Sequence, residues 1–173
     1  MSDERGSVSH PRIWTVEEAN SLVPRLSFLI GQQLATAAEI ERCWRRLVEL
    51  VDAGAPAVAL AGGQRAAAAA ARARPEQTLA RARSGSPEAR AAEQELTQRI
   101  TAYETGWRQV EELGVSVKDQ QTGLCDFYGR VEGRLVCLCW RYGEEGVRYY
   151  HEIDAGFAGR KPLTSDVRQR LLN

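Results

Sequence analysis

The sequence predicts an α+β fold, in which a long antiparallel helical hairpin is followed by a small antiparallel sheet of three or four strands. Apolar residues recur at helical spacing through two long segments that precede residue 114. Beyond that point, short β-branched and aromatic runs alternate with glycine-containing turns, which is typical of a meander. The expected organisation is a mobile tail (1–14), a helical hairpin (15–113), a β module (114–163) and a short C-terminal helix (164–173).

Charge and cysteine content limit the class of protein. The chain carries 23 basic and 23 acidic residues, so net charge gives no general attraction to nucleic acid. No apolar run approaches the length of a membrane span, and residues 1–14 lack a signal segment. The four cysteines follow no secreted disulfide spacing. We therefore expect a cytoplasmic protein with reduced thiols and no membrane association.

The first helix is predicted to begin at Thr15, because Glu18 lies three residues later and completes a capping box. Pro24 lies inside the pattern and is expected to bend the helix. The apolar stripe is wider than a two-helix seam requires, so we expect a third covering surface: the sheet, or a second subunit in a homo-oligomer. The stripe comprises two heptad sets, Val16, Val23, Ile30, Ala37, Trp44, Val51 and Ala19, Leu26, Gln33, Ile40, Leu47, widened by Leu22, Leu29, Cys43 and Leu50.

Composition changes at about residues 53–86, where glycine, proline, alanine and arginine predominate. This segment is either a loose, partly helical connector or a basic arm for an acidic partner. A second helix is expected to start at Ser86, with Pro87 at its first position, and to end at Gly114. Glu93 interrupts its apolar set. The two helices should pair as an antiparallel hairpin.

The cysteines and one histidine of the β module suggest a metal site. Cys137 and Cys139 lie two apart on a predicted strand and therefore project from one face. Cys125 and His151 lie on the neighbouring predicted strands, and zinc takes four thiolate or imidazole ligands. The spacing matches no established zinc signature, and the alternative is that these thiols are small buried hydrophobic groups.

A second hypothesis places His151 with Asp154 and Asp126 as a metal-assisted hydrolase site that would hold a divalent metal. The sequence has no HExxH motif, nucleophile motif or phosphate loop. The structural alternative is that His151 and Asp154 fix the loop by hydrogen bonds to the backbone or to Arg160. The residues leave open whether the protein is an enzyme.

The third hypothesis concerns the segment Gly156–Lys161. Its glycines could turn backbone amides towards a small anion, and Arg160 could bind phosphate or carboxylate with two hydrogen bonds. The predicted ligand-binding residues are His151, Asp154, Arg160 and Arg141. The structural alternative is a tight turn, with Arg160 paired to Asp154 or Glu152 and Phe157 in the core.

An aromatic and basic set could in principle form a stacking platform for single-stranded nucleic acid. Acidic residues surround it, however, and they repel a phosphate backbone, so the pattern disfavours nucleic acid as a partner. The set comprises Trp140, Arg141, Tyr142, Arg148, Tyr149 and Tyr150, and its acidic neighbours are Glu132, Glu144, Glu145, Glu152 and Asp154.

Two blocks of the chain resemble an uncharacterised prokaryotic family, domain of unknown function 2203. The first is Trp14-Thr15-Val16-Glu17-Glu18-Ala19-Asn20 followed by Leu22-Val23-Pro24. The second includes Gly114-Val115, Lys118-Asp119, Gly123-Leu124, Asp126-Phe127, Leu138-Cys139-Trp140-Arg141, Gly143-Glu144, His151, Asp154-Ala155-Gly156-Phe157-Ala158-Gly159-Arg160 and Pro162. The resemblance covers about half of the chain. It implies a long helical hairpin followed by a small β module, and it brings no known activity, substrate or cofactor. The long Ala/Arg-rich connector, Cys125 and Cys137 depart from the family pattern.

The leading functional interpretation is a non-enzymatic binding or assembly module. The wide stripe of the first helix would mediate self-association, and the His151–Arg160 loop would bind a small anion or stabilise the fold. The alternative is the metal-assisted hydrolase that uses His151, Asp154 and Asp126.

Overall fold

The computed structural model describes residues 12–53 and 74–171. His10, most of the expected tail and the centre of the 53–86 connector lie outside the described residues. The fold is α+β, and the chain divides into two compact units. The β unit comprises Met1–Leu34 and Trp107–Asn173, and the helical unit comprises Ala35–Gly106.

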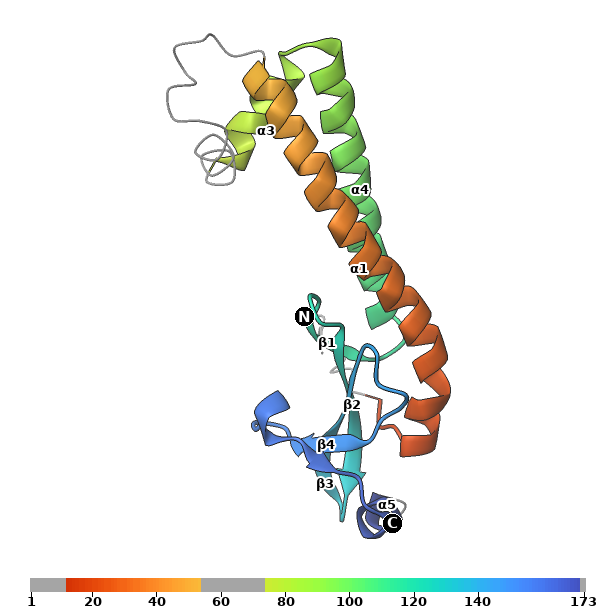
Figure 1. Ribbon diagram of the computed structural model, residues 1–173. Coiled ribbons are helices and arrows are strands. Elements are labelled where there is room, and N and C mark those ends of the chain that lie inside the picture. The colour runs from red at the N-terminus through yellow and green to blue at the C-terminus, as the bar shows by residue number, and fades with distance from the viewer. Residues whose placement is uncertain (1–11, 54–73, 172–173) are drawn as a thin grey trace, which may run out of the picture. The chain divides into compact units, whose positions relative to one another are not determined.

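The helices precede the strands along the chain, except for η2 and α5, and Figure 1 labels most of these elements. The helices are α1 (Val16–Ala53), α3 (Pro75–Arg83), α4 (Pro87–Glu111) and α5 (Ser165–Leu171), and a short 3-10 helix, η2, spans Phe157–Gly159. The strands are β1 (Ser116–Asp119), β2 (Leu124–Val131), β3 (Arg134–Arg141), β4 (Tyr149–Glu152) and β5 (Lys161–Pro162). Among the described helices, none is both long enough and apolar enough to cross a membrane.

The predicted capping box starts α1. The Thr15 backbone N–H donates to Glu18 Oε2 at 2.9 Å, and the Glu18 backbone N–H donates to Thr15 Oγ1 at 3.1 Å. These bonds satisfy amides that the first turn of a helix leaves without partners. Pro24 lies inside α1, which continues as one helix to Ala53.

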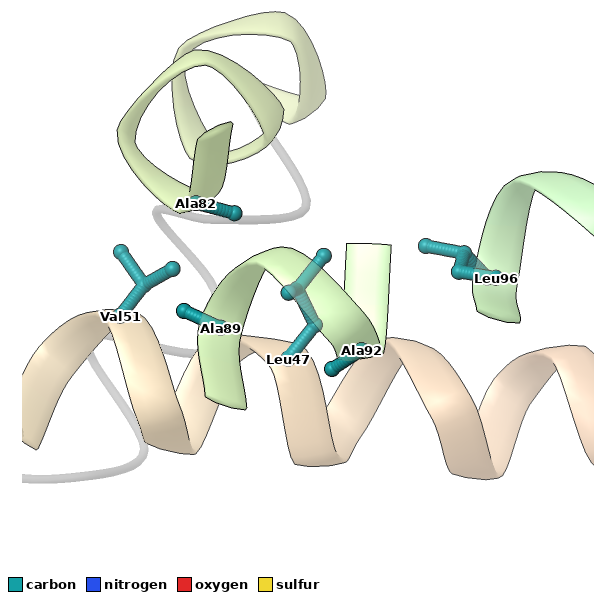
Figure 2. Packing of buried hydrophobic residues seen from close by; sticks show 6 residues of the cluster. All are labelled: Leu47, Val51, Ala82, Ala89, Ala92 and Leu96. Carbon is teal, nitrogen blue, oxygen red and sulfur yellow. The ribbon is translucent and has the colours of Figure 1, made fainter. Parts of the chain in front are cut away.

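The core of the helical unit consists of small and aliphatic side chains from three helices. Figure 2 shows Leu47 and Val51 of α1 beside Ala89 and Ala92 of α4, with Ala82 of α3 near them. Leu96 completes the cluster, and an ion pair joins Glu39 of α1 to Arg99 of α4. Since residue numbers rise along α1 as they fall along α4 in these contacts, the two helices run antiparallel here. Alanine at the contact allows close approach of the helices.

The described end of the expected connector is a regular helix, α3. Pro75 occupies the first turn of α3, where its missing N–H costs nothing, and basic residues occupy the last turn. Arg81 Nη2 donates to the Val51 carbonyl oxygen near the end of α1 at 3.2 Å. Arg83 Nε donates at 2.8 Å to Glu93 Oε1, so the acidic residue that interrupts the α4 pattern is buried and paired. The helix α3 therefore supports both of its neighbours.

The sheet is a five-stranded antiparallel meander in the order β1-β2-β3-β4-β5. We predicted three or four strands, and the additional strand is β5, which pairs only Lys161 and Pro162 with β4. Two residues carry no alternating pattern from which a strand could be predicted.

Glu132 and Gly133 form the β2–β3 turn with φ values of 51° and 75°. Two positive φ values are typical of a two-residue hairpin turn, which fixes the register of both strands.

The first part of α1 packs within the β unit. The Trp14 backbone N–H donates to the Tyr128 carbonyl oxygen at 2.7 Å, and the Trp14 ring meets the Phe127 ring edge-on at 5.3 Å. Asn20 Oδ1 accepts a 2.8 Å hydrogen bond from the Val147 backbone N–H. A Cβ at Gly123 would lie 2.6 Å from Ile30 Cγ2. The sheet therefore covers part of the wide apolar stripe.

Candidate functional site

The register of the sheet separates the four predicted cysteine and histidine ligands into two groups. Cys137 lies opposite His151, and Cys139 lies opposite Asp126. Because directly opposed residues share a face and neighbours along a strand alternate, Asp126, Cys137, Cys139 and His151 project from one face. Cys125 lies opposite Trp140 on the other face. Cys125 therefore does not share a face with the other three residues of the predicted metal set.

Three buried side chains of this face come close together. One ligand atom each from Asp126, Cys137 and His151 lie within 4.8 Å of one another. The residues are only 2%, 2% and 3% exposed. Among the described residues this is the only group of three His, Cys, Asp or Glu side chains with metal-compatible spacing. It combines members of two separate sequence hypotheses, the cysteine-histidine site and the His151–Asp126 site.

The imidazole of His151 is held at both nitrogens. Nδ1 lies 2.7 Å from the Glu152 carbonyl oxygen, and Nε2 lies 3.2 Å from Asp126 Oδ2. A carbonyl oxygen only accepts, so Nδ1 carries a proton. Nε2 and Oδ2 then need a second proton between them, carried by either the ring or the carboxyl group, because two lone pairs facing each other would repel. One proton shared between Nε2 and Oδ2 therefore joins the pair.

The carboxylate of Asp126 is incompletely satisfied. Its Oδ1 atom is buried without a hydrogen-bond partner among the described residues. Burial of an unpaired carboxylate oxygen costs free energy, so a cation or a hydrogen-bond donor at this atom would be favourable. Burial and the charge of Asp126 raise the pKa of Cys137 to about 11 and that of Cys139 to about 12. Without another ligand these thiols stay protonated at neutral pH and are poor nucleophiles.

Arg160 forms a separate cluster. Its Nη1 donates to Glu144 Oε1 at 2.8 Å and its Nη2 to Glu144 Oε2 at 2.7 Å, while Nη2 also lies 3.2 Å from the Cys139 carbonyl oxygen. The guanidinium carbon lies 4.3 Å from the centre of the Tyr149 ring and 4.9 Å from that of Phe157. The partner of Arg160 is therefore Glu144 rather than Asp154 or Glu152. We call this bidentate pair the Glu144–Arg160 clasp, because it joins the turn after β3 to the loop after β4.

Glu144 organises the turn that it occupies. The Arg141 backbone N–H donates to Glu144 Oε2 at 2.9 Å, and Trp140 Nε1 donates to the Glu144 carbonyl oxygen at 3.0 Å. Burial alone would raise the pKa of Glu144, but the hydrogen bonds from Arg160 and Arg141 and the positive charge of Arg160 outweigh it and lower that pKa. Burial opposes the charge of Arg160, yet the hydrogen bonds to Glu144 keep the pKa of that guanidinium raised. Both groups are therefore charged at neutral pH.

The side chains of the other predicted ligand residues, Asp154 and Arg141, do not complete either cluster. Asp154 is exposed and lies outside the three-residue group, so the hydrolase set is incomplete. Arg141 is exposed and its guanidinium carbon lies 5.5 Å from the centre of the Phe157 ring. Phe157 is itself 44% exposed, so it does not fill the core. His151 and Arg160 have different carboxylate partners and do not hold one ligand between them.

The aromatic and basic set considered for nucleic acid does not form one exposed surface, because Trp140 is fully buried while Tyr142 and Tyr149 are exposed. Sequence reasoning missed Glu144 as the partner of Arg160. The available signal was its position directly after Gly143 in the turn between two predicted strands, where a carboxylate can accept bonds from its own turn.

Comparison with known proteins gives one match. No curated protein and no solved structure matches the chain. A family model described as an uncharacterized conserved protein matches residues 12–163, which is most of the 173-residue chain and includes both clusters. The matched segment contains the capping box of α1, the meander and the Glu144–Arg160 clasp. The chain therefore belongs to the family of uncharacterized conserved proteins called DUF2203.

Proposed function

We propose that this protein is a non-enzymatic binding or assembly module in which the His151–Arg160 loop has a structural role. The observation that carries the proposal is that Arg160, the group best suited to bind an anion, is already bonded on two nitrogens to Glu144. Its side chain is 11% exposed. An incoming phosphate would have to displace a carboxylate of matching geometry, which offers little net gain.

The burial of the reactive groups argues against the hydrolase alternative. The side chains of His151 and Asp126 are 4% and 2% exposed. A catalytic metal keeps a position open to substrate or water, whereas a structural metal is enclosed by protein. Asp154, the third member of the hydrolase set, lies apart in an exposed position. A fold-stabilising role suits these groups better than catalysis.

Assembly through the helices remains part of the proposal. Phe28 of α1 is 65% exposed, the highest value among the exposed large hydrophobic residues of the described chain. Phe28 lies outside the stripe that the sheet and α4 cover in part, and a second copy could cover it. Light scattering across a concentration series should show a mass that rises with concentration and falls for Phe28→Ser. A constant monomer mass for the unaltered protein would contradict self-association.

Thermal unfolding in inorganic phosphate tests the structural role of Arg160. Arg160→Lys should lower Tm because lysine cannot form the bidentate pair, and phosphate should change Tm equally little in both proteins. Arg148→Lys is the matched control, since Arg148 is exposed and pairs with exposed Glu145. If phosphate instead raised Tm in the unaltered protein and not in Arg160→Lys, Arg160 would belong to an anion site.

A further inference from the structure

We propose that Asp126, Cys137 and His151 form a buried zinc site in the β unit, which goes beyond the structural role proposed for Arg160. The three donors are a carboxylate, a thiol and an imidazole, the ligand types that zinc takes in proteins. They come from three adjacent strands, β2, β3 and β4. Strands paired in a sheet hold their side chains in fixed positions, which favours a preorganised site.

The spacing of the donors fits a metal of this size. The three ligand atoms lie within 4.8 Å of one another. Tetrahedral zinc with ligand distances of about 2.0–2.3 Å would place its ligand atoms about 3.3–3.8 Å apart. The atoms therefore need to close by no more than about 1.5 Å, which rotation of the side chains can supply.

Two further observations point to a cation at this place. Asp126 is 2% exposed, and its buried Oδ1 has no hydrogen-bond partner among the described residues. His151 Nδ1 lies 2.7 Å from the Glu152 carbonyl oxygen, which leaves Nε2 directed at Asp126. A histidine that binds metal through one nitrogen typically donates from the other to a carbonyl or carboxylate oxygen. Zinc would take the place of the proton between Nε2 and Oδ2.

The burial of all three residues assigns the site to the structural class. Closed sites hold the metal on four protein ligands and add to the stability of the fold. Cys139 is the candidate fourth ligand, because it lies opposite Asp126 on the same face of the sheet. Its sulfur lies outside the three-residue group, so the metal would draw it inward.

The experiment uses untagged full-length protein, unfolded in denaturant with chelator and reductant, and refolded with zinc, with cobalt or without metal. Refolding is needed because the buried site offers a metal no direct path. We expect one equivalent of metal per chain, a thiolate-to-cobalt charge-transfer band, and a Tm about 5–10 °C higher with zinc at a hundredfold excess over Kd. Failure of the refolded protein to retain zinc or cobalt would overturn the proposal.

Cys137→Ala and Cys125→Ala form a matched pair, since both remove a buried thiol but only Cys137 lies on the Asp126 face. Cys137→Ala should weaken the cobalt charge-transfer band, because one of two thiolates is lost, and should weaken zinc binding at least about 100-fold, whereas Cys125→Ala should retain both. Asp126→Asn, which keeps the shape of the side chain, is the second test should Cys137→Ala not fold. Equal zinc binding by the two cysteine variants, or unchanged binding by Asp126→Asn, would contradict the site. The Arg160 measurements are independent of this outcome.

Discussion

The helical unit and the β unit reach stability by different means. In the helical unit the buried cluster is aliphatic, and its ion pairs, such as Arg83–Glu93 and Arg99–Glu39, include at least one exposed or half-exposed member. In the β unit, large aromatic residues such as Trp140 and Phe127 are fully buried, and the Asp126–His151 pair is buried with them. The helical unit tolerates small shifts of its side chains, because aliphatic contacts are not directional. The β unit depends on the register of its strands and on close contact between particular atoms.

The largest expected effect tests how tightly the β unit is packed. Gly123 has φ of 65°, and an added Cβ would lie 2.6 Å from Ile30 Cγ2 and 2.8 Å from Tyr142 Cβ. Gly123→Ala should lower the free energy of unfolding by about 4 kcal/mol, because overpacking adds to backbone strain. Urea denaturation measures this loss.

Gly133→Ala is the control for that substitution. Gly133 has φ of 75°, but a Cβ there would meet nothing within 4 Å. It should lose only about 1 kcal/mol, from backbone strain alone. Equal losses at the two glycines would mean that the contact of Gly123 with Ile30 and Tyr142 is not tight.

The next effect concerns the aliphatic cluster. Leu47 is fully buried in it, so Leu47→Ala should cost about 3 kcal/mol through lost burial and an unfilled cavity. Hydrogen exchange should locate the loss in the helical unit, with faster exchange of amides near Leu96 and little change near Phe127. Leu135→Ala, at an exposed position of β3, should change little. Uniform acceleration across both units would contradict separate cores.

The smallest of the three effects is dependent on pH. The pKa of Glu144 is lowered in the folded chain from its ordinary value of 4.5. The Glu144–Arg160 clasp therefore makes its full contribution to the free energy of unfolding above pH 4.5. Its contribution is lost as pH falls through the lower folded pKa. Glu144→Gln should therefore cost about 2 kcal/mol at pH 7, and the difference from the unaltered protein should shrink below about pH 4.5.

Urea denaturation from pH 7 to pH 3 follows this difference. Glu145→Gln is the control, since Glu145 is exposed and its pairing with Arg148 should contribute little. A difference for Glu144→Gln that stayed constant down to pH 3 would show that the charge of Glu144 is not what stabilises the turn.

Much of the fold was predictable because it depends on local patterns. The capping box at Thr15 formed, and the heptad positions Val16, Leu26 and Leu47 are buried. Helix α3 was missed as a core element because its contribution is mainly Ala82, and one small residue gives no amphipathic signal. Strand β5 was missed because two residues cannot show alternation.

The candidate site was only partly predictable, because its members meet through strand pairing. Sequence reasoning singled out Asp126, Cys137 and His151, but it distributed them between two hypotheses. The register could have been predicted from the hairpin loop, since a two-residue turn at Glu132–Gly133 places Cys125 opposite Trp140. The pairing of Arg160 with Glu144 was not predictable from spacing, because the loop between η2 and β5 carries no periodic pattern.

The two-residue turn at Glu132–Gly133 also constrains how this chain can vary. If the pairing of β2 with β3 slipped by one residue, the side chains of β2 would exchange faces relative to those of β3. Asp126 would then point with Trp140, and Cys125 would replace it beside Cys139. By fixing this register, the two positive-φ residues of the turn keep the carboxylate, thiol and imidazole on one face of the sheet, and a one-residue slip would divide them between the two faces.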